Sequence, residues 1–259
     1  MMLLNITLFI LFVFLINFTF KKKKMISNYS GNNHQMFSNQ KNIPLSGGLF
    51  LFIGLLLLFY DDENIKLFLI IFSIFVIGFF SDLKILSSPI KRFLLQIIAI
   101  ILSVFILNLQ VASTRIIFLD YLLDNTVFNY FFVSFSILIL LNGTNFIDGL
   151  NGLVLGYYLI ILLILQQLQL NSEILDIKHI INYLIVLFSI LFLFNLFNQF
   201  FLGDGGAYIL ALIFSFFLIS LNNFYQNISP FFIVLLLWYP CFELLFSILR
   251  KIRFHKSPI

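Results

Sequence analysis

Nine apolar stretches follow one another along almost the whole sequence, and they constrain the fold more than any other feature. A helix needs about 20 apolar residues to cross a bilayer core, although segments that close around a polar site can be shorter. Only 10% of the residues are charged, against roughly 25% in soluble domains. We therefore predict an all-α fold, a polytopic transmembrane bundle of about nine helices in one domain, residues 1–259. The stretches lie at about 2–20, 46–60, 66–80, 93–109, 127–145, 152–170, 179–197, 205–222 and 229–249.

The distribution of basic residues predicts how the bundle is oriented. Lys21 to Lys24 follow the first stretch and no basic residue precedes it, so we expect a retained helix with its N-terminus outside. Alternation of sides then places twelve of the fifteen Lys and Arg residues inside, as the positive-inside rule requires. Membrane orientation thus accounts for the net charge of +4, and no nucleic-acid partner is predicted. The inner segments are predicted at 21–45, 81–92, 146–151, 198–204 and 250–259.

Four acidic residues fall at this inner end, namely Asp82, Asp148, Asp204 and Glu243. A bare carboxylate at the end of an apolar helix is costly, and those retained there are usually paired, metal-bound or exposed to a cavity. For a single aspartate, helix capping or a nearby lysine would be explanation enough. Three aspartates in glycine- and asparagine-rich turns at one end of the bundle favour a functional site.

Two inner loops carry weaker signals. The paired glycines Gly47 and Gly48 would let the backbone approach a ligand or a neighbouring helix, and a simple turn into the second helix is an equal alternative. In the next loop Asp82 is followed by Lys91 and Arg92, which could hold an anionic lipid or a phosphate at the membrane surface. Membrane orientation explains part of that positive charge.

The third inner loop is the richest in polar residues. If helix continues through it, Asn142, Asn145 and Asp148 share one face by their spacing of three, and Asn151 extends the polar stripe. A polar stripe at that depth is expensive unless it faces a ligand. We therefore expect Asn145 and Asn151 to contact a ligand.

The fourth inner loop places Asp204 at the start of a helix, directly before Gly205. Free N–H groups and the helix dipole would favour a phosphate there, and the carboxylate would favour the cation that travels with it. Mg²⁺ suits such a site because it prefers one or two carboxylates together with waters and substrate phosphates. The sequence has no Cys/His set typical of zinc.

These segments, in this order, resemble the polyprenyl-phosphate N-acetylhexosamine-1-phosphate transferases of glycosyltransferase family 4, relatives of the phospho-N-acetylmuramoyl-pentapeptide transferases. The resemblance implies transfer of a sugar 1-phosphate from a UDP-N-acetylhexosamine to undecaprenyl or another polyprenyl phosphate, with release of UMP. It implies Mg²⁺, with Mn²⁺ as an alternative. It also implies the initiating step of an envelope glycan such as O-antigen, at the bacterial inner membrane, with the active site facing the cytoplasm. The motifs are NGTNFIDGLNGL at 142–153, FLGDGGAY at 201–208, PLSGG at 44–48, FSDLKILSSPIKRFLLQ at 80–96 and WYPCFELLFSILRK at 238–251.

The chain departs from this family in three places. The family usually has paired aspartates where this chain has Ser81 and Asp82, and a second aspartate where it has Asn151. The family also continues past the basic motif into a histidine-rich loop and usually another helix, which we expect residues 1–259 to lack. His255 is expected to be a surface residue and not a substitute.

The resemblance assigns roles to residues of this chain. We expect Asp82, Asp148 and Asp204 to be catalytic, with Asp148 and Asp204 holding the metal ion. Three alternatives stay open: an inactive or fragmentary relative, an intramembrane prenyltransferase, and a secondary transporter. The clustering of acids at one end disfavours a transporter, whose site is expected near the bilayer midplane. The expected substrate-binding residues are Asn145, Asn151, Gly47, Gly48, Lys91, Arg92 and Gly205.

Overall fold

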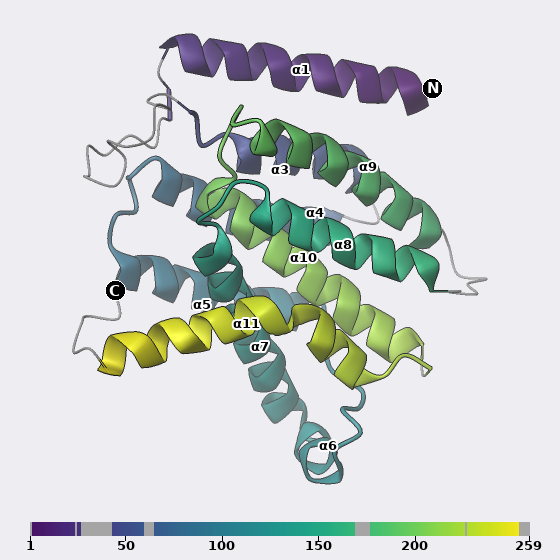
Figure 1. Cartoon of the computed structure of the whole chain (residues 1–259). Helices are drawn as coiled ribbons and strands as arrows, with labels where there is room; N and C mark the ends of the chain where they lie inside the picture. Colours follow the sequence, from purple (N-terminus) through teal and green to yellow (C-terminus); the bar gives the residue numbers. More distant parts are fainter. Residues whose placement is uncertain are drawn as a thin grey trace.

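The computed structural model of the chain describes residues 2–23, 25–26, 43–59, 65–168, 177–225 and 227–253. These residues form ten helices, shown in Figure 1. The prediction of an all-α bundle is confirmed. The helices are α1 (Met2–Lys23), α3 (Gly47–Phe59), α4 (Ile65–Asp82), α5 (Pro89–Ile106), α6 (Ile117–Leu123), α7 (Thr126–Ile147), α8 (Leu153–Gln167), α9 (Ile177–Leu196), α10 (Gly203–Phe224) and α11 (Pro230–Arg253).

Each predicted apolar stretch overlaps one of these helices, and α6 is an additional helix that the apolar pattern does not reveal. With seven residues, α6 is far too short to cross a bilayer. Within the described ranges six helices, α4, α5, α7, α9, α10 and α11, are long and apolar enough to span a membrane, and α3 and α8 are shorter apolar helices. The chain is a multi-pass membrane protein.

One end of the bundle gathers the predicted inner ends of all nine apolar helices. The amino end of α10 contacts the ends of α3, α4, α5 and α7, while the turn between α9 and α10 contacts the ends of α1 and α8. The end of α11 reaches α7, where Lys251 lies 5.4 Å from the ring centroid of Phe146. That this end faces the cytoplasm stays a prediction. Of the basic residues on which this prediction rests, Lys24, Lys41 and Lys256 lie outside the described ranges. His255, expected at the surface, also lies outside them.

Helix α10 occupies the centre of the bundle, and Figure 1 shows it crossing beneath α8. About two thirds of the residues in its most apolar 18-residue segment are buried, more than in any of the other five candidate membrane-spanning helices. Glycines allow its amino end to touch the backbones of its neighbours: a Cβ on Gly78 of α4 would lie 2.5 Å from the Cα of Gly205. A Cβ on Gly48 of α3 would lie 2.5 Å from the nitrogen of Gly206. This backbone contact fixes where α10 begins relative to α3 and α4.

Helix α11 contains a proline whose structural cost is offset by a neighbouring helix. Pro240 has no N–H group, so the carbonyl of Leu236, four residues earlier, loses its partner within the helix. The hydroxyl of Tyr157 on α8 donates a hydrogen bond to that carbonyl. Gly143 of α7 has no side chain where the Pro240 carbonyl packs against it. The middle of α11 is therefore held against α7 and α8.

The short helix α6 is tied to the preceding loop at the end of α7 opposite to Asn145. The carboxylate of Asp120 accepts hydrogen bonds from the hydroxyl and N–H of Thr114, each at 2.6 Å, and from the hydroxyl of Ser113 at 2.8 Å. The N–H of Arg115 donates to it as well, at 3.1 Å. Hydrogen bonds from the Thr114 side chain and N–H, followed by the Ser113 hydroxyl, lower the pKa of Asp120 below its usual range.

We expect Gly78→Ala to destabilise the bundle by about 1–3 kcal/mol, the usual cost of forcing extra volume into a packed contact. The new methyl group would meet the backbone of α10, which cannot rotate away as a side chain could. Thermal unfolding in detergent micelles measures the change. Gly149→Ala is the matched control because a Cβ there has no atom within 4 Å. Equal unfolding temperatures for Gly78→Ala and wild type would contradict the proposed backbone contact.

Candidate active site

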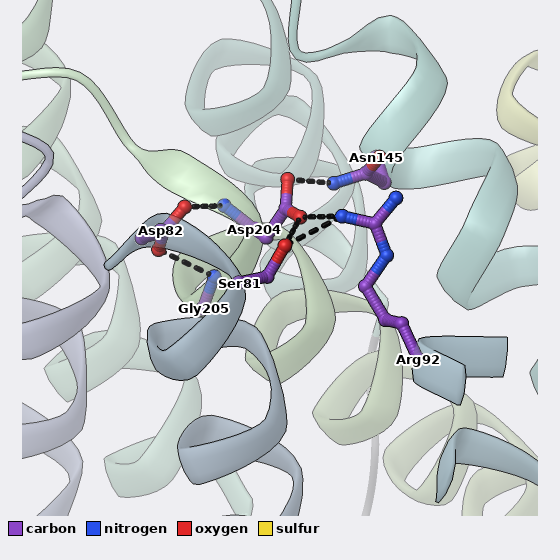
Figure 2. A network of polar contacts seen from close by, with 6 residues as sticks. All are labelled: Ser81, Asp82, Arg92, Asn145, Asp204 and Gly205. Atoms are coloured by element: carbon purple, nitrogen blue, oxygen red, sulfur yellow. Dashed lines mark hydrogen bonds and ion pairs between the residues drawn. The ribbon is translucent and has the colours of Figure 1, made fainter. Parts of the chain in front are cut away.

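The carboxylate of Asp204, the second residue of α10, joins three other helices (Figure 2). Its Oδ2 accepts a hydrogen bond of 2.6 Å from the hydroxyl of Ser81 on α4 and lies 2.5 Å from Nη1 of Arg92 on α5. Its Oδ1 accepts a hydrogen bond of 2.6 Å from the amide of Asn145 on α7. We call these four residues the Asp204 network. It collects polar groups that are up to 123 positions apart in the sequence.

Asp82, the last residue of α4, caps the amino end of α10 from outside the helix. Its Oδ1 accepts from the N–H of Asp204 at 2.8 Å and its Oδ2 from the N–H of Gly205 at 3.1 Å, as Figure 2 shows. Gly203 has a φ of +76°, and a Cβ there would lie 2.7 Å from the Asp82 carboxylate. The expectation of free N–H groups for phosphate at Asp204 and Gly205 is therefore wrong, because a carboxylate of the chain already accepts from both.

Asp148 lies beside these two acids, directly after the end of α7. Burial raises the pKa of Asp148 well above its ordinary value, and the nearby carboxylates of Asp204 and Asp82 raise it further. A hydrogen bond from the N–H of Gly203 acts in the opposite direction. The three predicted catalytic aspartates thus lie together at one place, and their catalytic role stays a prediction.

The donor chemistry of this cluster fits a hard divalent cation. Mg²⁺ prefers carboxylate oxygens, and a cation between these carboxylates would relieve the repulsion that raises the pKa of Asp148. The described residues contain no group of three or more His, Cys, Asp and Glu side chains already arranged around a metal position. Asp204 instead bonds to Arg92 and Ser81. Asp148 and Asp204 could hold Mg²⁺ if Arg92 moved away from Asp204.

The three asparagines of the third loop have different surroundings. Asn145 joins Asp204, whereas the amide of Asn142 donates to a carbonyl of its own helix at 2.9 Å. Helix α7 ends at Ile147, so the prediction that Asn151 extends a helical stripe is wrong. Asn151 lies in the following turn and donates to the side chain of Asn198. Contact of Asn145 or Asn151 with a substrate stays a prediction.

The predicted substrate-binding glycines of the first loop lie against the α9–α10 turn. The N–H of Gly47 donates to the carbonyl of Phe201 at 3.0 Å, and that of Gly48 to the carbonyl of Leu202 at 2.9 Å. Both glycines are buried, so the structure places them in backbone packing. Lys91 is exposed on α5 and free to meet solvent or a lipid head group. A substrate-binding role for these residues stays a prediction.

Sequence reasoning missed two polar residues of this region. It noted Ser81 only as the loss of an acid, whereas its hydroxyl bridges Arg92 and Asp204. It also passed over Gln96, which is buried and has no hydrogen-bond partner for either amide atom within the described ranges. The Tyr208 hydroxyl lies near Gln96 but does not reach hydrogen-bonding geometry. The spacing of four between Arg92 and Gln96 could have revealed that both face α10.

The raised pKa of Asp148 predicts how stability depends on pH. Folding favours the protonated form, so the stabilising contribution is complete below the ordinary carboxyl pKa of 3.8. It is lost as pH rises through the higher folded-state value. In metal-free buffer, wild type should therefore lose more thermal stability than Asp148→Asn when pH rises from about 4 to about 8. Parallel profiles for the two proteins would contradict this assignment.

Asp120→Asn is the control for that titration because its shift has the opposite sign. The lowered pKa of Asp120 means that its contribution is present above 3.8 and lost as pH falls through the lower folded-state value. Asp120→Asn should therefore differ from wild type at neutral pH and converge with it in acid. Thermal unfolding of both variants over one pH series measures the two opposite pH dependences of stability together.

Known proteins match this chain over most of its length. The model of glycosyl transferase family 4 matches residues 64–222, more than half of the chain. A probable undecaprenyl-phosphate N-acetylglucosaminyl 1-phosphate transferase of Bacillus subtilis (strain 168) is 27% identical over 233 residues, which are 85% of this chain and 63% of that protein. A phospho-N-acetylmuramoyl-pentapeptide-transferase of Buchnera aphidicola subsp. Acyrthosiphon pisum (strain Tuc7) is 28% identical over 183 residues, 63% of this chain and 51% of that protein.

The chain therefore spans between about half and two thirds of the length of these curated relatives. The region that matches the family model contains every residue drawn in Figure 2, from Ser81 to Gly205. It also contains Asp148 and the central helix α10 up to Asn222. The resemblance seen in the motifs of the sequence is confirmed, and the chain belongs to glycosyl transferase family 4.

Proposed function

We propose that this chain transfers an N-acetylhexosamine 1-phosphate from a UDP-sugar to a polyprenyl phosphate such as undecaprenyl phosphate. The observation that carries the proposal is the Asp204 network beside Asp82 and Asp148, at one end of a bundle of membrane-spanning helices. The names of the two relatives, both sugar-phosphate transferases, support the class of reaction. The product would be a polyprenyl-diphosphate-sugar, the starting lipid of an envelope glycan.

The reaction consists of one displacement at phosphorus. An oxygen of the lipid phosphate attacks the β-phosphorus of the UDP-sugar and forms the new P–O bond. The bond from that phosphorus to the oxygen bridging the two phosphates breaks, and UMP leaves with the bridging oxygen. Such a reaction depends on positioning and on charge neutralisation more than on a covalent partner in the protein. An acceptor phosphate is largely ionised at neutral pH, so no protein base is needed to activate it.

The aspartates and Arg92 have separate roles in this proposal. Asp204 orients the polar groups of α4, α5 and α7, and Asp82 positions Asp204 by binding the N–H groups at the start of α10. A Mg²⁺ or Mn²⁺ ion held by Asp148 and Asp204 would supply charge neutralisation for the diphosphate. Arg92 offers a planar set of donors that suits phosphate oxygens.

The surroundings of Arg92 suit a lipid acceptor. The next residues on α5, Phe93 and Leu94, are about half exposed, and apolar exposed side chains continue along the same helix. A polyprenyl chain lying against this face would bring its phosphate to the level of Arg92 and Lys91. We place this end of the bundle at the cytoplasmic face of a bacterial inner membrane, because it holds most of the basic residues.

The proposal is tested by transfer of radiolabel from UDP-N-acetylglucosamine to undecaprenyl phosphate by the purified 259-residue chain. The readout is label extracted with the lipid, measured with and without Mg²⁺. A panel of UDP-N-acetylhexosamines identifies the preferred sugar. Absence of lipid-linked label with every donor of the panel would overturn the proposed reaction, and label that needs no divalent cation would overturn the role of Mg²⁺.

Asp204→Asn should lower turnover by at least about 100-fold, the scale of losing one electrostatic catalytic group. The amide retains the shape of the side chain and loses the charge that holds Arg92 and a cation. Asp120→Asn is the control, because it removes one carboxylate at the opposite end of α7 and should leave turnover near wild type. A fall of less than about tenfold in Asp204→Asn would remove Asp204 from the proposed machinery.

A further inference from the structure

We propose that Arg92 is a built-in counter-cation of Asp204, which a divalent cation must displace before it can bind Oδ2 of that carboxylate. The inference rests on the proposed function and adds a step to it: the site exchanges one positive charge of the protein for the metal ion. It follows from the geometry of the Asp204 network, because the guanidinium of Arg92 bonds to a carboxylate oxygen that a metal ion would need as a ligand.

The Arg92–Asp204 contact is short and partly shielded from solvent. Nη1 of Arg92 lies 2.5 Å from Oδ2 of Asp204, and the two side chains are only 28% and 24% exposed. Nη1 also donates to the hydroxyl oxygen of Ser81 at 2.5 Å, and that hydroxyl donates in turn to Oδ2. The guanidinium is therefore fixed by two partners, unlike a surface ion pair that rearranges freely.

A divalent cation cannot share Oδ2 of this carboxylate with Arg92. Oδ2 already receives two donors and Oδ1 receives the amide of Asn145. Mg²⁺ needs its oxygen ligands at about 2.0–2.1 Å in near-octahedral geometry. Two positive charges on one carboxylate oxygen would also repel each other strongly at such short separation. Cation binding and the Arg92–Asp204 ion pair are therefore mutually exclusive on Oδ2.

Release of Arg92 has a consequence for the substrates. Once Asp204 holds the cation, the guanidinium keeps Ser81 as a neighbour and regains donors that can bind phosphate oxygens. A metal ion arriving with a sugar diphosphate would thus make Arg92 available at the moment when phosphate is present. Before that moment the ion pair balances the charge of the Asp204 carboxylate and occupies the guanidinium of Arg92.

The first test measures Mn²⁺ binding to the purified full chain by electron paramagnetic resonance, without nucleotide or lipid. Arg92→Gln removes the competitor, so it should bind Mn²⁺ about tenfold more tightly than wild type. Binding to the variant with none detected for wild type would support the proposal as well. Equal or weaker affinity in Arg92→Gln, or no binding to either protein, would overturn it.

Two controls make the change specific to Arg92. Lys84→Gln removes one positive charge from an exposed position of the adjoining turn, outside the Asp204 network, and should leave Mn²⁺ affinity within about twofold of wild type. Asp204→Asn combined with Arg92→Gln should abolish the gain. An equal gain in Lys84→Gln would show that overall charge, and not displacement, controls the affinity.

A second test uses the wild-type chain and so does not depend on the folding of a variant. Phenylglyoxal labels accessible arginines, and mass spectrometry maps the sites. Addition of Mg²⁺ should raise labelling of Arg92 several-fold, while the exposed Arg115, Arg250 and Arg253 serve as internal references. Unchanged or reduced labelling of Arg92 would overturn the proposal. Neither test depends on turnover. Sugar transfer without displacement of Arg92 would overturn this proposal alone, and displacement without sugar transfer would overturn the proposed function alone.

Discussion

The cap that Asp82 places on the amino end of α10 is the interaction on which the rest of the site depends. A helix that begins inside a bundle leaves N–H groups without partners, and a buried unpaired N–H group is costly. The carboxylate of Asp82 binds two of these groups, at Asp204 and Gly205. The side chain of Asp204 is thereby directed toward α5 and α7, where it meets Arg92 and Asn145. Loss of this cap would move every group of the Asp204 network.

Close backbone packing gives that cap its position. Gly48 and Gly78 let α3 and α4 touch the first turn of α10, so α4 delivers Asp82 and its neighbour Ser81 to adjacent points of the same helix end. In a membrane, where lipid is as apolar as the side chains, small residues at helix contacts are a main source of close association. These glycines therefore serve the site through packing. The bundle holds three aspartates of like charge together, since they do not attract one another.

The three acids of this cluster are stabilised by different neighbours. Asp82 has two N–H partners and Asp204 has Arg92, whereas the pKa of Asp148 is raised by burial and by its acidic neighbours. The first two acids are thus stabilised by N–H groups and by an ion pair, whereas the surroundings of Asp148 favour its protonated form. A divalent cation would change the last two at once. That property suits the proposed reaction between a phosphate and a diphosphate, whose negative charges a bound cation would balance.

The sequence by itself determined the membrane-spanning bundle, nine of its helices, the acids at one end and the family. The lengths of the apolar stretches and the order of the motifs can be identified in the sequence without knowledge of the fold. Only the tertiary structure decided the partners of those acids. Ser81 reads as a missing aspartate and Arg92 as a surface charge until α4 and α5 meet at Asp204. The end of α7 at Ile147 and the short helix α6 are local features that an apolar pattern does not reveal. The pairing of Asn151 with Asn198 depends, like the Asp204 network, on contacts between distant segments. Such contacts follow from helix packing, which a periodic pattern of apolar residues does not specify.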